Sequence, residues 1–379
     1  MRNYRELKDT EKRKRILWVT NMPAPYRLPI LDLLGEIYEL DVYFLLGKNN
    51  WRNWNLENKY RTWNYYFLNL RTVVFKEFEF IVGLGLKIKN LSEYDVVILG
   101  SWENPVYLRL MRKAKKMNKV VIPIYESHAK SQKFNTGIVA AIRANFFKKA
   151  NLVVTFGPAS TRAVREMGIE NKVILELFNL VDNFWFQTSL NRNLGTLKIG
   201  HTFLFIGQLI ERKNIQTAIY AFAHIAGIND RFRIVGEGPQ LRFLETLAQE
   251  LKIERQVDFM GYRDQSELTK IFNDSHTLVL PSKTEVWGLV VNEALACGLH
   301  AVVSDQAGIS ESINGQRGVY ITSTGVTEFA QAMQQAKLDW KGWIINPEIN
   351  SYSKEIFIQR LVERIEVEMH GQFSQKSNN

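Results

Sequence analysis

The sequence predicts an α/β protein built from two domains. The chain has 379 residues, which is too long for one ordinary core and suits two domains of about 150 to 200 residues each. Short apolar runs rich in β-branched residues alternate with stretches of helical period along the whole length, which is typical of βαβ units and parallel sheets. A polar segment with Gly and Asn at 189–200 breaks both periods, so we place the linker there.

The first half is predicted to form a domain over residues 1–190. The segment 51–75 is aromatic and shows no regular period, so it is predicted to be irregular. Strands are expected at 15–20, 40–46, 95–100, 119–125 and 152–155, and helices near 27–37, 104–117, 137–149 and 158–168.

The second half alternates more regularly and predicts a doubly wound parallel sheet over 191–353. Helical patterns follow each of its expected strands, at 202–206, 231–235, 256–260, 276–280 and 300–303. The amphipathic stretch at 354–368 is expected to lie in a helix, 354–370, that packs back towards the first domain. The polar tail 371–379 is expected to be disordered.

Composition excludes several classes of protein. Hydrophobic residues make up 46% and charged residues 23% of the chain, close to the averages of folded soluble proteins, so disordered and collagen-like chains are excluded. No run of roughly 18 apolar residues suggests a membrane-spanning helix, and the N-terminus lacks a signal-peptide cleavage site. The single cysteine, Cys297, and six scattered histidines predict no thiol–metal site. We expect a cytosolic, unprocessed protein.

Positive charge is concentrated in the first half. Residues 1–190 hold 30 Lys and Arg against 18 Asp and Glu, whereas residues 191–379 hold 19 against 21. Within the first half, residues 101–150 carry 11 basic and 2 acidic side chains. Such a density attracts phosphates, anionic lipid headgroups or nucleic acid, and it is equally consistent with a solvated face.

A cation pair follows the first strand of the second half. Gly207 allows a tight backbone turn there, and Arg212 with Lys213 precedes the next helix. Cations at a strand-to-helix turn suit a diphosphate, because their charge acts on the same anion as the helix N-terminal amides. Helices also often begin with solvated Lys and Arg, so this segment alone leaves both interpretations open.

Two glutamates eight positions apart follow the strand at 276–280. Glu285 lies on the loop, and Glu293 lies in the second turn of a helix that we expect to start around Gly288. Carboxylates at these places suit hydrogen bonds from sugar and ribose hydroxyls, and the free amides between Val286 and Leu289, Trp287 included, suit a phosphate. The alternative is that both glutamates are ordinary helix-surface residues.

Two glycine segments favour structural roles. In VGEGPQ, Gly236 and Gly238 are expected to form the turn into a helix whose first residue is Pro239. Gly261 follows a predicted strand and either relaxes a turn or lets a flat base approach the backbone.

In this order, FIGQLIERKN, RIVGEGPQ, VDFMGY, LVLPSKTEVWGLVVNEALACG and VVSDQAGISESI resemble the C-terminal domain of glycosyltransferase family 4. This family comprises retaining nucleotide-sugar transferases of GT-B architecture. The resemblance covers about residues 200–315, and the first half is similar more loosely, through NMPAPYRLPILDLL, YESH and FNLVD. It is similar to enzymes that build bacterial surface polysaccharides.

The resemblance implies specific roles. Glu285 would contact the donor sugar, Glu293 the ribose and Lys213 the donor phosphates. His128 in YESH would face the reacting sugar, and Glu311 matches an acidic position of uncertain role. The family also implies two Rossmann-like domains facing across a cleft, with retention of the anomeric configuration.

One position departs from the family pattern. Many relatives have an arginine after the glycine of FIGQ, where this chain has Gln208, and a neutral amide cannot balance phosphate charge. Arg212 is hypothesised to compensate. The sequence has no Asp-x-Asp motif for a divalent metal, so we expect metal-independent activity and no cofactor.

The expected activity is transfer of a hexose from a nucleoside-diphosphate sugar to a saccharide or lipid-linked saccharide acceptor. UDP is the nucleotide that we expect in the donor. The segments 138–149 and 75–91 mix apolar residues with lysines and suit either an anionic membrane interface or core packing, so a peripheral protein on the inner membrane face is an alternative. A nucleotide-sugar epimerase is the rival enzyme. Against a nucleic-acid-binding protein, the chain lacks a recognition motif.

Overall fold

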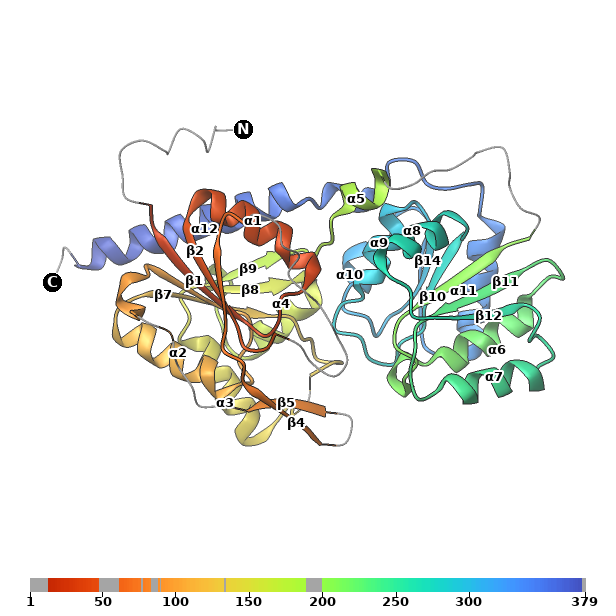
Figure 1. Ribbon diagram of the computed structural model, residues 1–379, viewed down its shortest axis with the longest axis horizontal. Helices are drawn as coiled ribbons and strands as arrows, with labels where there is room; N and C mark the ends of the chain where they lie inside the picture. The colour runs from red at the N-terminus through yellow and green to blue at the C-terminus, as the bar shows by residue number, and fades with distance from the viewer. Residues whose placement is uncertain are drawn as a thin grey trace.

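The computed structural model describes residues 13–47, 61–75, 78–82, 88, 90–132, 134–188 and 200–376. Two parallel sheets, each flanked by helices, form two domains that lie end to end (Figure 1). The α/β class and the two doubly wound sheets are thus confirmed. The expected linker lies at residues 189–199 outside the described residues, with only Gly200 of that segment inside.

The first sheet has seven parallel strands in the order β3-β2-β1-β6-β7-β8-β9. Their bounds are β1 Arg15–Thr20, β2 Glu39–Phe44, β3 Asn64–Phe67, β6 Val96–Leu99, β7 Val120–Tyr125, β8 Val153–Phe156 and β9 Ile174–Leu177. The helices are α1 Leu28–Ile37, α2 Pro105–Lys116, α3 Gly137–Lys148, α4 Gly157–Glu166 and α5 Asn183–Thr188, and an antiparallel hairpin joins β4 Arg71–Phe75 to β5 Phe78–Val82.

The second sheet has six parallel strands in the order β12-β11-β10-β13-β14-β15. Their bounds are β10 Thr202–Ile206, β11 Arg231–Val235, β12 Val257–Gly261, β13 Thr277–Leu280, β14 His300–Ser304 and β15 Val319–Thr322. The helices are α6 Ile215–Ile225, α7 Leu241–Glu250, α8 Gln265–Asn273, α9 Leu289–Ala296, α10 Ser310–Ile313, α11 Val326–Leu338 and α12 Lys354–Lys376.

Alternation along the strands builds a core on each face of the first sheet. Leu17 and Val19 of β1 pack with α2, α3 and α4, whereas Ile16 and Trp18 point to the other face and pack in the cluster that includes α1 and α12. Helix α12 runs back along the first domain, as expected (Figure 1). There the Tyr38 hydroxyl hydrogen-bonds to the carboxylate of Glu366 (2.5 Å).

Four expectations about elements were wrong. The segment 51–75 is not wholly irregular, because β3 pairs with β2 and β4 begins at Arg71. The side chains of β3 are all exposed, so no alternation of burial marks it in the sequence. Strands β9 and β15 were not predicted. The helix after VGEGPQ begins at Leu241, because the amide of Gln240 donates to the carbonyl of Leu209 in a preceding turn (3.0 Å). Helix α12 continues to Lys376, so 371–376 are helical.

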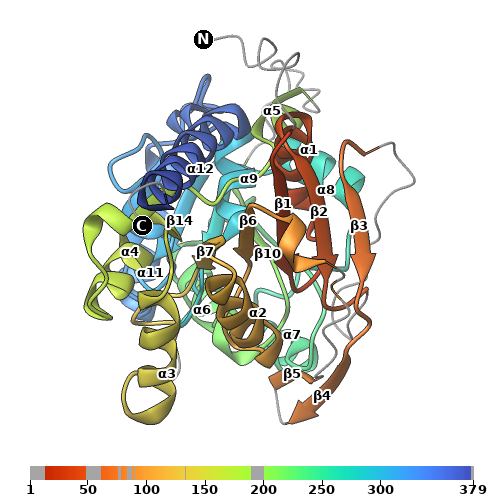
Figure 2. The ribbon, with the colours of Figure 1, turned by 90° about the vertical axis from the view of Figure 1, so that its left-hand side faces the viewer.

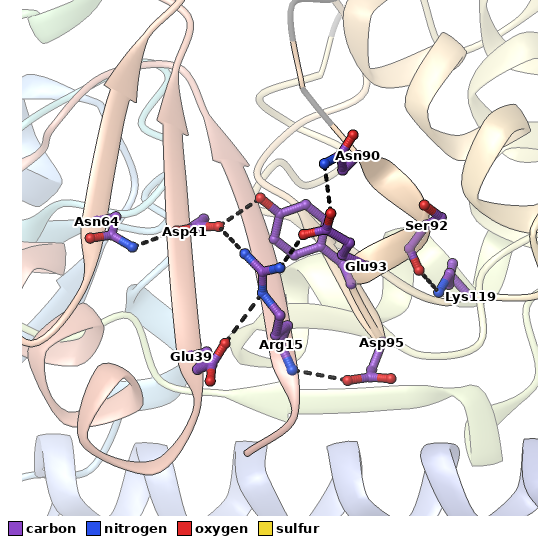
Figure 3. Close-up of polar contacts among 10 residues, drawn as sticks. Arg15, Glu39, Asp41, Asn64, Asn90, Ser92, Glu93, Asp95 and Lys119 are labelled. Carbon is purple, nitrogen blue, oxygen red and sulfur yellow. Dashed lines mark hydrogen bonds and ion pairs between the residues drawn. The ribbon is translucent and has the colours of Figure 1, made fainter. Parts of the chain in front are cut away.

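The amino ends of the first sheet are held together by a charged network (Figure 3). Arg15, the first residue of β1, pairs with the carboxylates of Asp41 on β2 (3.2 Å) and of Glu93. Buried Asp41 also accepts hydrogen bonds from Tyr94 (2.6 Å) and Asn64 (2.9 Å). Every acceptor atom of Asp41 therefore has a donor, and the network fixes the register of β1, β2 and β3 at the end of the sheet away from the ligand-binding edge.

Three buried histidines lie at the amino ends of strands in the second sheet. His201 hydrogen-bonds to the hydroxyl of Thr277 (2.9 Å), and the ring of His276 lies 4.9 Å from that of His201. The rings of His201, His276 and His300 all contact the indole of Trp340, at 4.9 to 5.8 Å between centroids. Burial, with His276 adding to it, lowers the pKa of His201 to about 3. His201 is therefore neutral in the native state at neutral pH.

We expect this cluster to make the second domain acid-sensitive. Unfolded His201 takes up a proton near its ordinary pKa of 6.5, whereas the native imidazole does not until about pH 3, so stability is full above pH 6.5 and falls by about 1.4 kcal/mol for each pH unit below it. His201→Gln should reduce the drop in Tm between pH 7 and pH 5, measured by circular dichroism. His224→Gln, at an exposed histidine of α6, should leave the drop unchanged.

Candidate functional site

The candidate site lies at the carboxyl edge of the second sheet, where the strand order reverses. β10 and β13 are neighbours there, and their following chains leave in opposite directions to α6 and α9. Open parallel sheets bind ligands at such a switch point. Lys213 follows β10 in a short 3-10 helix, Glu211–Lys213, and Glu285 follows β13 on the loop before α9. The fold therefore brings together two residues that are 72 positions apart.

Glu285 and Lys213 form an enclosed ion pair. The Lys213 ammonium donates to Oε2 of Glu285, whose side chain is only 13% exposed. Arg212 lies 3.9 Å from the same oxygen, and the Ser282 hydroxyl lies 3.4 Å from it. Burial would raise the pKa of Glu285, but the Lys213 ammonium outweighs burial and holds the pKa below its ordinary value. Glu285 is thus a charged acceptor at neutral pH.

A glycine fixes the approach of the loop to α9. Gly288 has φ of 107° and directly precedes Leu289, the first residue of the helix, as expected. A Cβ there would lie 2.9 Å from Cδ2 of Leu280, so both conformation and space require glycine. The indole of Trp287 points into the core, where it packs edge-on against Phe178 (5.0 Å). Only its backbone can therefore face a ligand, whereas Val286 is exposed.

Glu293 lies one turn inside α9 and is half-buried. Burial raises its pKa to about 8. Among the residues that the structure describes, no cation or hydrogen-bond donor is paired with its carboxyl group. Glu293 is thus mostly protonated at pH 7, in contrast to Glu285, and it can ionise when a ligand supplies donors.

The glycines at the carboxyl ends of β10, β11 and β12 lie side by side. A Cβ on Gly236 would lie 1.8 Å from the carbonyl oxygen of Gly207, and the amide of Gly236 donates to the carbonyl of Gly261 (2.8 Å). Gly261 has φ of 67° and open space where a Cβ would be. Gln208 and Gly207 are half-buried beside Lys213. The backbone is therefore open at Gly261, whereas Gly207 and Gly236 pack against each other.

His128 brings the first domain to this site. Its Nε2 hydrogen-bonds to the backbone carbonyl of Glu285 (2.9 Å), and the Ser131 hydroxyl accepts from its amide (2.9 Å). Because a carbonyl only accepts, Nε2 carries a proton and Nδ1 is the free acceptor of a neutral ring. Burial lowers the pKa of His128, which favours that neutral form.

Two ion pairs close the two domains around a small pocket beside His128. Arg162 of α4 makes a two-pronged pair with Glu311 of α10, and Lys130 lies 3.6 Å from the carboxylate of Asp305. Both pairs line the pocket together with His128. Glu311, whose role was uncertain, is thus an interdomain contact residue. No sequence pattern indicates Arg162 as its partner, because the two residues lie 149 positions apart.

The pattern that defines the family "glycosyl transferases group 1" matches residues 191–350. This segment contains Lys213, Glu285 and Glu293, the residues that the fold gathers at the switch point. The second domain of the chain therefore matches the pattern of this family. The predicted resemblance is confirmed.

Curated relatives match the chain over part of their length. A glycogen synthase of Mycobacterium tuberculosis is 34% identical over 134 residues, covering 35% of this chain and 32% of the relative. The N-acetyl-alpha-D-glucosaminyl L-malate synthase of Bacillus anthracis is 26% identical over 185 residues, covering 48% of each chain. The matched part of the chain therefore spans less than half the length of these relatives.

Solved structures share the whole two-domain architecture. Sucrose-phosphate synthase of Thermosynechococcus elongatus has a TM-score of 0.64 at 15% identity and covers 96% of this chain and 99% of its own. HepE of Anabaena in complex with UDP has a TM-score of 0.66 at 13% identity, with the same coverage. The predicted GT-B architecture is thereby confirmed.

A further pair on the first domain was missed in the sequence. Buried Arg27, after β1, donates to Oε1 of Glu126, after β7. Its guanidinium lies between the rings of Tyr26 (5.5 Å) and Phe156 (5.3 Å). Glu126 remains partly exposed, two residues before His128. The segments PYR and YES contain the two charged residues, but 99 positions separate them and only the parallel sheet brings the two segments together.

Proposed function

We propose that this protein is a retaining, metal-independent glycosyltransferase that moves a hexose from a nucleoside-diphosphate sugar to a saccharide or lipid-linked saccharide. The observation that supports this most directly is the enclosed Glu285–Lys213 pair at the switch point, facing His128 of the other domain. It provides a cation for a leaving diphosphate and a charged carboxylate for sugar hydroxyls within a few ångströms of each other.

Donor binding would rearrange this pair. The diphosphate would compete with Glu285 for the Lys213 ammonium. Arg212 would supply the second positive charge that many relatives have from an arginine at the position of Gln208. Glu285, released from Lys213, would then accept hydrogen bonds from the sugar. The ribose would donate to Glu293, whose carboxyl group has no competing partner among the described residues.

The leaving group needs charge stabilisation, which the two cations and the amides before α9 supply. Within the described residues no group of three His, Cys, Asp or Glu could hold a metal ion. The acceptor would enter on the side of the first domain, where Glu126 and His128 lie just after the carboxyl end of β7. Arg27 holds Glu126 in place there.

We propose that the donor is a UDP-sugar. Structures of HepE of Anabaena are described in complex with UDP and, at a TM-score of 0.63 and 14% identity, with UDP-glucose. In the described part of the chain no helix is long and apolar enough to cross a bilayer. We place the enzyme in the cytoplasm, on the inner membrane face when it meets a lipid-linked acceptor.

Thermal-shift measurements with UDP, GDP, dTDP and CDP in the presence of chelator test the donor. One nucleotide, UDP, should raise Tm by roughly 5 to 10 °C at a hundredfold excess over its dissociation constant, because it binds only the native state. Product analysis with the matching nucleotide sugar should show transfer only when a saccharide acceptor is present. Conversion of the sugar without acceptor would indicate an epimerase instead, and no shift with any nucleotide would contradict the proposal.

A further inference from the structure

The first half of α3 and Phe134, three residues before the helix, expose an apolar surface. The side chains are large and aliphatic or aromatic, and their exposed fractions are far above those of core residues: Phe134 67%, Ile138 79%, Val139 38% and Ile142 45%. We name these four residues the α3 tip. The second half of the helix differs, because Phe146 and Phe147 are buried against the sheet. The helix is thus anchored at one end and apolar at its free end.

The α3 tip is held rigidly. Buried Arg143 donates to the backbone carbonyl of Phe134 (3.3 Å), and its guanidinium lies over the indole of Trp102 (5.6 Å). Trp102 lies three residues before the first residue of α2, so the Arg143 side chain connects α3, the segment before α3 and the segment before α2. The apolar side chains are therefore presented to solvent by fixed backbone.

Helices α2 and α3 carry only positive charges, and the exposed Glu103 lies two residues before α2. Helices α2 and α3 lie side by side on one face of the first domain (Figure 2). Neither helix contains Asp or Glu, whereas α2 exposes Arg112, Lys113 and Lys116. An apolar surface next to a helix whose exposed charged side chains are all cations is complementary to a bilayer with anionic headgroups.

We propose that the α3 tip docks this protein on an anionic membrane surface, with Phe134, Ile138, Val139 and Ile142 in the interface and the cations of α2 on lipid phosphates. This inference rests on the proposed function, because a docked α3 would bring the acceptor side of the cleft to the membrane. His128 precedes the first residue of α3 by only nine positions. A saccharide linked to a lipid in that bilayer would then reach the site while its lipid stays in the membrane.

Sedimentation with vesicles tests the docking surface on the full chain. The protein should bind vesicles of phosphatidylcholine with added phosphatidylglycerol, bind pure phosphatidylcholine weakly, and lose binding as salt is raised. The double variant Ile138→Ser with Ile142→Ser should bind the anionic vesicles about tenfold or more weakly, since two apolar anchors are lost. Both side chains are exposed, so the variant should fold like the parent.

A matched control replaces Ile228 and Ile345 of the second domain by serine, since these side chains are 88% and 80% exposed. This control should bind vesicles like the parent. Equal binding of parent and α3 variant, or equal binding to neutral and anionic vesicles, would overturn the docking. A dimer on gel filtration that the α3 variant loses would instead assign the surface to a second copy. A UDP-induced thermal shift in a protein that does not bind vesicles would contradict the docking and leave the proposed function standing. Vesicle binding without such a shift would contradict the proposed function and leave the docking standing.

Discussion

Glu285→Gln is expected to lower kcat/KM for sugar transfer about a hundredfold or more. The amide has the shape of the carboxylate but lacks the charge that, in the proposed function, holds the sugar and orients it toward the acceptor side. Binding of UDP should not weaken, because Lys213 loses the carboxylate that competes with phosphate. Steady-state transfer rates together with UDP-induced thermal shifts measure both effects.

Lys213→Met should give the opposite pattern for nucleotide binding. It removes the cation nearest to the expected diphosphate and leaves Glu285 buried without its partner, so the UDP-induced shift should disappear and the free protein should lose stability. Glu348→Gln serves as control, since Glu348 is paired with Arg317 on the surface of the second domain (2.7 Å). It should change neither rate nor shift. A UDP shift in Lys213→Met equal to that of the parent would contradict the assignment of this pair.

Glu293→Gln is expected to stabilise the free protein and weaken donor binding together. The pKa of Glu293 is raised to about 8 from an ordinary 4.5, so the unfolded chain releases this proton at lower pH than the native protein does. Stability from this group is therefore full below pH 4.5 and lost as pH rises towards 8, on the order of 2 kcal/mol at pH 7 after allowance for partial exposure. The variant avoids this loss, and its Tm should rise by about 5 °C.

Measurement across pH separates this effect from a general change in packing. The difference in Tm between Glu293→Gln and the parent should be small at pH 5 and grow up to pH 8, whereas Glu245→Gln on exposed α7 should show no difference at any pH. UDP binding by the parent should strengthen as pH rises to 8, because the ribose donates to the ionised carboxylate. A variant that binds UDP like the parent would show that Glu293 does not hold the ribose.

The strands of the core could be predicted because buried strands appear in the sequence as short apolar runs. β1, β10 and β13 are apolar runs followed by helical periods, and the spacing of Gly288 from Glu293 placed the start of α9 correctly. β3 could not be predicted, because backbone pairing with β2 holds it while its side chains remain exposed.

The candidate site could be predicted in part. The segments with Lys213 and Glu285 were identifiable, and their position beyond strand ends implied that they meet. The opposite charge states of Glu285 and Glu293 could not be predicted, since they depend on burial and on one nearby ammonium. The pairs Arg27–Glu126 and Arg162–Glu311 could not be predicted either, because nothing local links residues 99 and 149 positions apart.

The return of α12 to the first domain has a consequence for folding during synthesis. α12 covers the face of the first sheet that holds α1, with the ring of Phe357 stacked on that of Phe156 (6.3 Å). The ribosome makes the whole second sheet before it makes residues 354–376. Part of the apolar face beside α1 therefore stays uncovered until the second domain has been made. The first domain is completed last rather than first.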